Sequence, residues 1–144
     1  MSMELHVFSA QPLDSVAAWQ RAIDAEGFAL QLSAERPFQA VKGFLPAQSG
    51  GEATGFECYH DDPRDLAAGY HDVDFDHSWM CVLTFRWGSN LFGCLAACMA
   101  TAAYAKATSG IVFDPDSSEI LTSQQAIERA RQMEQEAGHD PGGA

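Results

Sequence analysis

The sequence predicts a single α+β domain built on a mainly antiparallel sheet of about five or six strands. Short apolar or alternating runs that are typical of strands recur along the chain. One long segment, 90–108, is apolar almost all round, as a buried helix must be. No internal repeat or long linker divides the 144 residues, a length that suits one domain. We therefore expect one domain over 1–137, in which the 90–108 helix packs on the sheet between two flanking helices, and a flexible tail at 138–144.

The first segments predict a strand, a helix and a second strand. The apolar run at 5–8 is typical of a short strand. Asp14 or Ser15 then caps a helix whose apolar residues recur at helical spacing, and Gly27 ends it. Residues 28–32 alternate with a period of two, which indicates that the chain returns as a strand.

The next stretch predicts two strands separated by a surface turn. We expect a short strand at 41–45 and a turn over 46–54, because the latter contains Pro, Ser and two glycines. Alternation resumes at 55–59, where Phe56 and Cys58 share one face.

The segment 79–87 is the strongest strand of the sequence. Its aromatic and β-branched residues form an almost continuous apolar run, which favours a central position covered on both faces. The odd positions project from one face and are expected to be core; they are Trp79, Cys81, Leu83, Phe85 and Trp87. Arg86 lies on the opposite face, where we expect it to form an ion pair with an acidic residue.

The C-terminal part predicts a helix, a hairpin and a last helix. Ser89 or Asn90 caps the buried helix, which ends at 109–110. Residues 111–121 read as two short strands joined by a turn that contains Pro and Asp. Thr122 precedes Gln125 by three residues, which is the spacing of a capping box, so a helix begins there.

The charge of the chain excludes several kinds of partner. Twenty acidic residues against eight basic ones give a net charge of -12, so the chain repels polyanions. We expect no binding to DNA, RNA or anionic membranes. The first residues lack a basic region followed by an apolar run, and no segment reaches the length of a membrane span, so we expect a cytoplasmic protein with reduced cysteines.

The acidic segment from Glu52 to His77 is the compositional anomaly of the chain. It holds eight acidic residues and one basic residue, Arg64. Three interpretations remain open: a solvated loop whose aspartates cap turns, a docking surface for a basic partner, or a metal site. The docking surface would consist of Asp61, Asp62, Asp65, Asp72, Asp74 and Asp76. The metal site would draw on His60, Asp61, His71, Asp72 and His77.

No established motif for catalysis, cofactors or metals accompanies this segment. Aspartates that alternate near Asp74 and Asp116 lack the Gly and Glu positions of a calcium loop, and the nucleophile and phosphate-loop motifs are missing. We therefore predict no bound metal and no cofactor. Cys94 and Cys98 are four residues apart on the buried helix, so they share a face; this spacing is neither a zinc nor a redox motif, and we interpret both as core.

Three stretches carry a resemblance to a group of known proteins: Gly55-Phe-Glu, Thr84-Phe-Arg-Trp-Gly-Ser, and the Ala-rich helix that ends in Thr108-Ser-Gly-Ile-Val-Phe-Asp-Pro-Asp. Over about the C-terminal two-thirds, the chain resembles small bacterial proteins that are encoded singly or near secreted toxins. The resemblance implies an intracellular α+β domain without catalysis, and an immunity role in some relatives. It implies no catalytic residue.

The sequence leaves three functional hypotheses. The first is a non-enzymatic binding module, in its sharpest form an immunity-type protein that presents an acidic face to a basic protein. The alternative is a small metal-dependent enzyme that uses the His- and Asp-rich segment 60–77, which requires those side chains to converge in a pocket. The third is a homodimer that buries a sheet edge or aromatic side chains.

Overall fold

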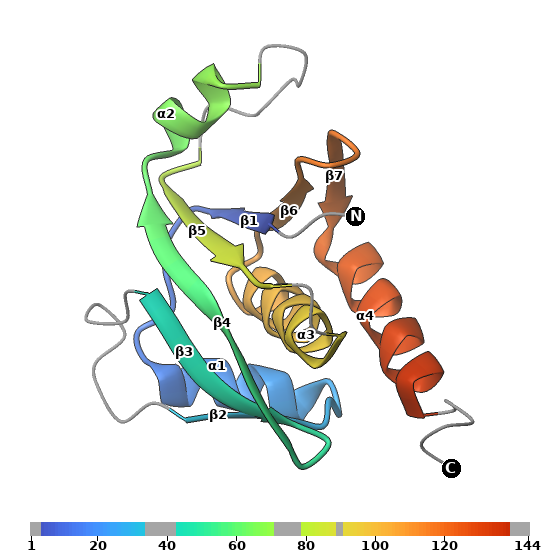
Figure 1. Cartoon of the computed structure of the whole chain (residues 1–144). Helices are drawn as coiled ribbons and strands as arrows, with labels where there is room; N and C mark the ends of the chain where they lie inside the picture. Colours follow the sequence, from blue (N-terminus) through green and yellow to red (C-terminus); the bar gives the residue numbers. More distant parts are fainter. Residues whose placement is uncertain (1–3, 34–42, 71–78, 89–90, 139–144) are drawn as a thin grey trace.

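The computed structural model describes residues 4–33, 43–70, 79–88 and 91–138, which form an antiparallel sheet with helices α1, α3 and α4 on one face (Figure 1). The strands are β1 (Glu4–Ser9), β2 (Leu30–Leu32), β3 (Gly43–Ser49), β4 (Glu52–Asp61), β5 (Cys81–Arg86), β6 (Ile111–Asp114) and β7 (Glu119–Thr122). The helices are α1 (Val16–Ala25), α2 (Pro63–Ala68), α3 (Leu91–Ala107) and α4 (Ser123–Gly138). The order across the sheet is β2-β3-β4-β5-β1-β6-β7. The predicted α+β class is confirmed, with seven strands in place of five or six.

The helices α1 and α3 build the main core around Trp19. This side chain is fully buried, and its Nε1 donates a hydrogen bond of 3.0 Å to the carbonyl oxygen of Ala100 on α3. Its ring meets Phe56, Phe85 and Tyr104 edge-on at centroid distances of 6.1, 5.7 and 5.5 Å. The many alanines of α3 allow it to lie close to the sheet, between α1 and α4 (Figure 1). The expected arrangement of a buried helix with two flanking helices is confirmed.

The predicted ends of the outer helices are also confirmed. The Ser15 hydroxyl caps α1 by accepting from the Ala18 amide at 3.0 Å. At the start of α4, Thr122 and Gln125 form the reciprocal capping box, with hydrogen bonds of 2.9 and 3.1 Å. Among the described residues, no helix is long and apolar enough to cross a membrane.

The turn predicted within 46–54 is present at Gly50 and Gly51, but it is shorter than predicted, because β3 continues through Pro46 to Ser49 and β4 begins at Glu52. The carbonyl oxygen of Pro46 accepts from the Ser33 amide at 2.9 Å, beyond the last β2 residue. Since the nitrogen and the carbonyl of one strand residue point to the same side, the proline nitrogen also faces the β2 side. The proline therefore removes no hydrogen bond to β4.

The structure differs from the sequence analysis at two further places. The first is helix α2, which the sequence analysis does not include; Asp62 caps it by accepting from the Arg64 amide at 2.8 Å, and Pro63 occupies its first turn. Trp79 does not extend the core face of β5, because the strand begins at Cys81 and Trp79 packs with a second apolar cluster on the opposite side of the sheet. The central position of β5 is confirmed. The caps Ser89 and Asn90 and the tail residues 139–144 lie outside the described residues.

Candidate functional site

The face of the sheet that α1, α3 and α4 leave open carries a row of interacting polar side chains. Alternation along β1 and β5 places Glu4, His6, Thr84 and Arg86 on this face. The alternate residues of the same strands, such as Val7 and Leu83, face the helices. The strand register sets Glu4 opposite Arg86 and His6 opposite Thr84. The two central strands of the sheet therefore bring four polar groups from distant parts of the chain into contact.

These groups form a continuous chain of hydrogen bonds from β4 to β1. The Thr84 hydroxyl donates to the carboxylate of Asp61, and the Thr84 oxygen lies 2.8 Å from Nδ1 of His6. Nε2 of His6 lies 3.0 Å from Oε2 of Glu4, and Nε of Arg86 donates to Oε1 of the same carboxylate at 2.5 Å. We call Asp61, Thr84, His6, Glu4 and Arg86 the open-face network. The expected ion pair of Arg86 is confirmed, with Glu4 as its partner.

The open-face network holds an imidazole almost completely away from water. His6 is 1% exposed and stacks on Phe113 at 6.0 Å. Burial lowers the pKa of His6 below its ordinary value, and the Glu4 carboxylate opposes this shift. Burial alone would raise the pKa of Glu4, but Arg86 and His6 together lower it. The nearby charges thus keep Glu4 ionised, while burial favours neutral His6.

The protonation of His6 decides how many of these contacts are attractive. Because the Thr84 hydroxyl donates its hydrogen to Asp61, Nδ1 of His6 must be the donor in the hydrogen bond between His6 and Thr84. A neutral imidazole then has no proton left on Nε2, which faces the Glu4 carboxylate. The contact between His6 and Glu4 becomes a hydrogen bond only when Nε2 of His6 carries a second proton. The number of hydrogen bonds in the open-face network therefore depends on pH.

A shallow pocket of about 300 Å³ adjoins the network at the end of β4. Its lining consists of Tyr59, His60, Asp61 and Arg86. The Tyr59 hydroxyl donates to Glu57 at 2.7 Å, which raises the pKa of Tyr59, and the Arg86 guanidinium lies 5.8 Å from the centre of the Tyr59 ring. The pocket therefore offers an aromatic ring and a carboxylate, two groups that bind cations.

Apolar side chains flank the open-face network on both sides. Phe8, Val82 and Phe113 form the second core cluster, against which part of α2 packs. Toward the sheet edges, Phe44 on β3 and Ile120 on β7 are 57% and 39% exposed. The open face thus combines polar groups with exposed apolar ones, a combination that is typical of protein interfaces.

The structure describes three of the six residues predicted to bind a partner. Asp61, Asp62 and Asp65 are all exposed. They lie at the end of β4 and on α2, which extends beyond the sheet at the top of Figure 1. Asp72, Asp74 and Asp76 lie outside the described residues. The interpretation of aspartates as turn caps holds for Asp62, and Asp61 belongs to the open-face network.

The metal-site interpretation is tested only in part. Of its five residues, the structure describes His60 and Asp61, while His71, Asp72 and His77 lie outside the described residues. Within the described ranges, no three His, Cys, Asp or Glu side chains are grouped so that they could hold a metal ion. The convergence that the enzyme hypothesis requires is therefore not observed in this part of the chain.

Sequence reasoning missed His6, the centre of the network. A single histidine in a short apolar strand carries no recognisable motif. The available signal was the alternation of Glu4 with His6 and of Thr84 with Arg86, which places each polar pair on one face of its strand. The register that joins the two strands is a tertiary feature, so the pattern alone does not show that the pairs meet.

Comparisons with known proteins give no indication of the function of this chain. No family model, no curated protein and no solved structure matches this chain.

Proposed function

We propose that this protein is a non-enzymatic binding module that docks a basic protein on the exposed acidic residues at the end of β4 and on α2, beside the open-face network. The observation that carries the proposal is the position of Asp61. This carboxylate lines the pocket with Tyr59, belongs to the open-face network, and is continuous with the exposed acids of α2. A lysine or arginine side chain of a partner would find a carboxylate and an aromatic ring in one place.

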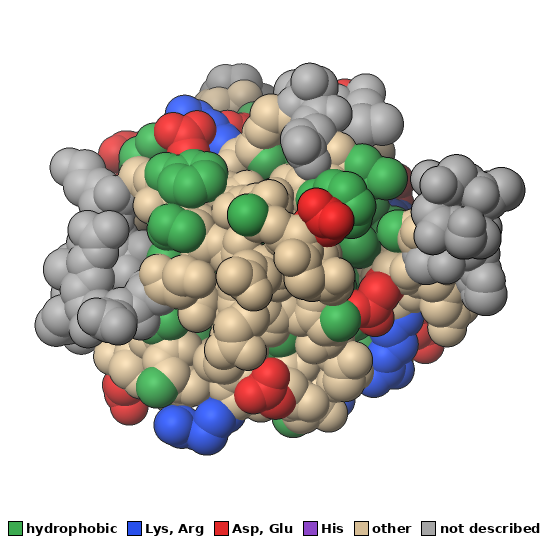
Figure 2. Space-filling model, turned by 60° about the horizontal axis from the view of Figure 1, so that its bottom comes forward, with side chains coloured by type: hydrophobic (Ala, Val, Ile, Leu, Met, Phe, Trp, Pro, Cys, Tyr) green, Lys and Arg blue, Asp and Glu red, His purple; other side chains and the backbone are tan. Residues whose placement is uncertain are grey.

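The distribution of charge supports this choice of partner. The basic Arg86 of the open face is held by Glu4, so its charge is offset locally. The opposite end of the molecule, turned forward in Figure 2, shows acidic, basic and apolar side chains intermixed without a concentration of one sign. An exposed acidic surface at one end speeds the encounter with a basic protein and disfavours acidic ones. Immunity-type neutralisation of a basic toxin is the most specific form of this proposal, and it rests on the resemblance described above.

A charge-matched pair of variants tests the proposal. The docking variant carries Asp61→Asn, Asp62→Asn and Asp65→Asn, and the control carries Asp24→Asn, Glu128→Gln and Glu136→Gln, three exposed acids elsewhere. Asn caps helices about as well as Asp, so α2 is retained. With a basic partner isolated from the native host, we expect the docking variant to associate at least about tenfold more slowly at low salt, and the control to keep the wild-type rate.

Salt provides a second measurement. Because screening shortens the reach of exposed charges to about 8 Å at physiological ionic strength, wild-type association should slow as salt rises. If both variants associate equally slowly, the net charge of the chain, and not the position of these aspartates, determines the rate. Unchanged rates in the docking variant would show that these aspartates are only solvated, and either result would overturn the proposal.

A further inference from the structure

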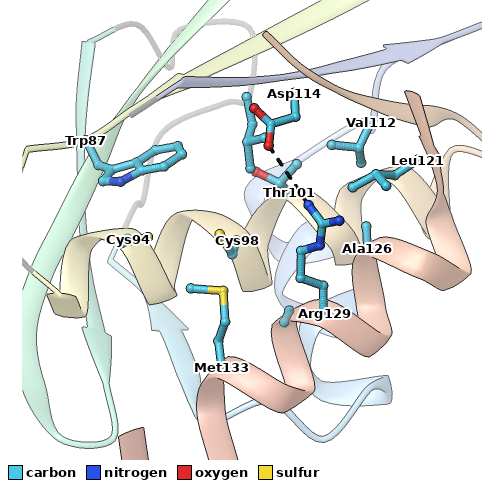
Figure 3. Close-up of a pocket in the computed structure, with 12 residues that line it drawn as sticks. Trp87, Cys94, Cys98, Thr101, Val112, Asp114, Leu121, Ala126, Arg129 and Met133 are labelled. Carbon is cyan, nitrogen blue, oxygen red and sulfur yellow. Dashed lines mark ion pairs between the residues drawn. The ribbon is translucent and has the colours of Figure 1, made fainter. Parts of the chain in front are cut away.

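A second pocket lies on the other side of the sheet, between α3, α4 and the β6–β7 hairpin (Figure 3). Its volume is about 220 Å³, which exceeds the roughly 150 Å³ of an apolar cavity that takes up benzene. Most of its lining is apolar, including Leu5, Val112 and Leu121 from the sheet and Met133 from α4. Small apolar molecules fit this pocket by size and by polarity.

Two thiols from α3 line this pocket. Cys94 and Cys98 are partly buried and pack against the main core, whereas Cys58 is fully buried in it. The prediction that the cysteines are core residues is therefore confirmed for Cys58, while Cys94 and Cys98 lie at the edge of the core and Cys81 is only partly buried. The two thiols influence each other: the neighbouring Cys98 favours the charged form of Cys94, and Cys94 disfavours the charged form of Cys98. The thioether side chain of Met133 reaches from α4 toward the two thiols (Figure 3).

The indole of Trp87 supplies a further donor beside Cys94. Trp87 is 8% exposed and lines the pocket, and its Nε1 has no hydrogen-bond partner in the described part of the chain. A buried N–H without an acceptor is costly, at about 1–3 kcal/mol. A thiolate on Cys94 would provide that acceptor, because a charged sulfur accepts more strongly than a neutral thiol.

Both donors therefore favour the same charged form of Cys94. The neighbouring Cys98 thiol lowers the pKa of Cys94 to about 7; burial opposes this shift, and the Trp87 N–H, which can donate to the charged sulfur, adds to it. The other thiols behave differently. Burial raises the pKa of Cys58 and of Cys81, and the bond to Cys94 raises that of Cys98 well above the ordinary value.

We propose that Cys94 is a covalent modification site that takes small apolar α,β-unsaturated aldehydes bound in the Trp87–Met133 pocket. The Cys94 thiol first loses its proton to water. Its sulfur then forms a bond to the β-carbon of the aldehyde, while the electron pair of the C=C bond moves to the carbonyl oxygen as an enolate. The α-carbon takes a proton from water, so the product is a thioether and no oxidant is consumed. Trp87 and Cys98 act as positioning residues, because each can donate a hydrogen bond to the sulfur once it is ionised.

The chain contains its own control in Cys81, a partly buried thiol in a strand. At pH 7, a thiol with a pKa near 7 is about half ionised, and one at or above 9 is about 1% ionised or less. The lower basicity of the Cys94 thiolate reduces its nucleophilicity by roughly tenfold over two pKa units. We therefore expect adduct formation at Cys94 to be at least about fivefold faster than at Cys81.

The experiment follows adducts of trans-2-hexenal at each cysteine of the full chain by peptide mass spectrometry between pH 5.5 and 9. The rate at Cys94 should level off above about pH 7, whereas the rate at Cys81 should keep rising. Acrolein, which has the same reactive group without the apolar tail, is the matched probe. If the pocket binds the tail, the preference for Cys94 over Cys81 is larger with hexenal than with acrolein.

Two variants test the positioning residues. Trp87→Phe and Cys98→Ala should each shift the pH midpoint at Cys94 upward and slow its reaction at pH 7, while Cys81 keeps its rate; circular dichroism checks that both variants fold. Because the comparison within the wild-type chain requires no substitution, the test stands even where a variant unfolds. Equal rates at the two cysteines, or the same preference with acrolein as with hexenal, would overturn the proposal.

Discussion

Removing the hydroxyl of Thr84 isolates the contribution of the open-face network to stability. Thr84→Val keeps the shape of a side chain that is 1% exposed, but it removes the groups that bind Asp61 and Nδ1 of His6. The buried imidazole nitrogen then lacks a partner, at a cost of about 1–3 kcal/mol, and the bond to the charged Asp61 is lost as well. The added methyl group returns about 0.8 kcal/mol through burial. We expect the free energy of unfolding to fall by about 2 kcal/mol.

Thr101→Val is the matched control, because Thr101 is also 1% exposed. Its hydroxyl donates to the carbonyl oxygen of Ala97, one turn earlier in α3, at 2.5 Å. That oxygen also takes part in the backbone hydrogen bonds of the helix, so the loss of the hydroxyl leaves no buried group without a partner. We expect a loss of less than about 1 kcal/mol.

Urea unfolding of the wild type and both variants measures the difference. The slope of the free energy against urea should stay the same, so that the midpoints report stability alone. The reasoning fails if Thr84→Val costs no more than Thr101→Val, since the open-face network would then contribute nothing beyond packing.

Two further outcomes follow from the same structure. Because burial lowers the pKa of His6, the unfolded chain binds more protons than the folded one between the folded pKa and about 6.5; stability should therefore rise with pH through this window, and urea midpoints from pH 5 to 8 should show a flatter rise in His6→Gln. If the rise is as steep without His6, another group causes it. Gly110→Ala should destabilise the fold by about 1–3 kcal/mol, because an added Cβ would lie 2.3 Å from the carbonyl oxygen of Phe8. Gly88→Ala, where a Cβ meets nothing within 4 Å, should be nearly neutral by thermal unfolding, and similar losses at both glycines would contradict the steric argument.

The elements that could be predicted from the sequence are those with a strong local signal. The capping box of Thr122 and Gln125 and the apolar run of β5 depend on neighbouring residues, and both are present in the structure. The path of β3 through Pro46 could not be predicted in this way. It depends on where β2 ends, which is a property of the neighbouring strand.

The candidate sites were less accessible to sequence reasoning than the fold. Asp61 was identified from charge density, but its contact with Thr84 joins residues 23 positions apart through the register of β4 and β5. Likewise, the spacing of Cys94 and Cys98 shows that they share a helix face. It does not show that this face borders a pocket with Trp87, because that depends on how α4 packs.

The short outer strands of the sheet limit how two molecules could associate. β2 has three residues and β7 has four, and the backbone N–H of Thr122 at the end of β7 is already bound by the side chain of Gln125. Pairing through so few backbone groups would give a new strand little to hydrogen-bond with. Extension of the sheet across two copies is therefore disfavoured at these strands. A partner that docks on this fold would therefore gain little from main-chain pairing at these strands.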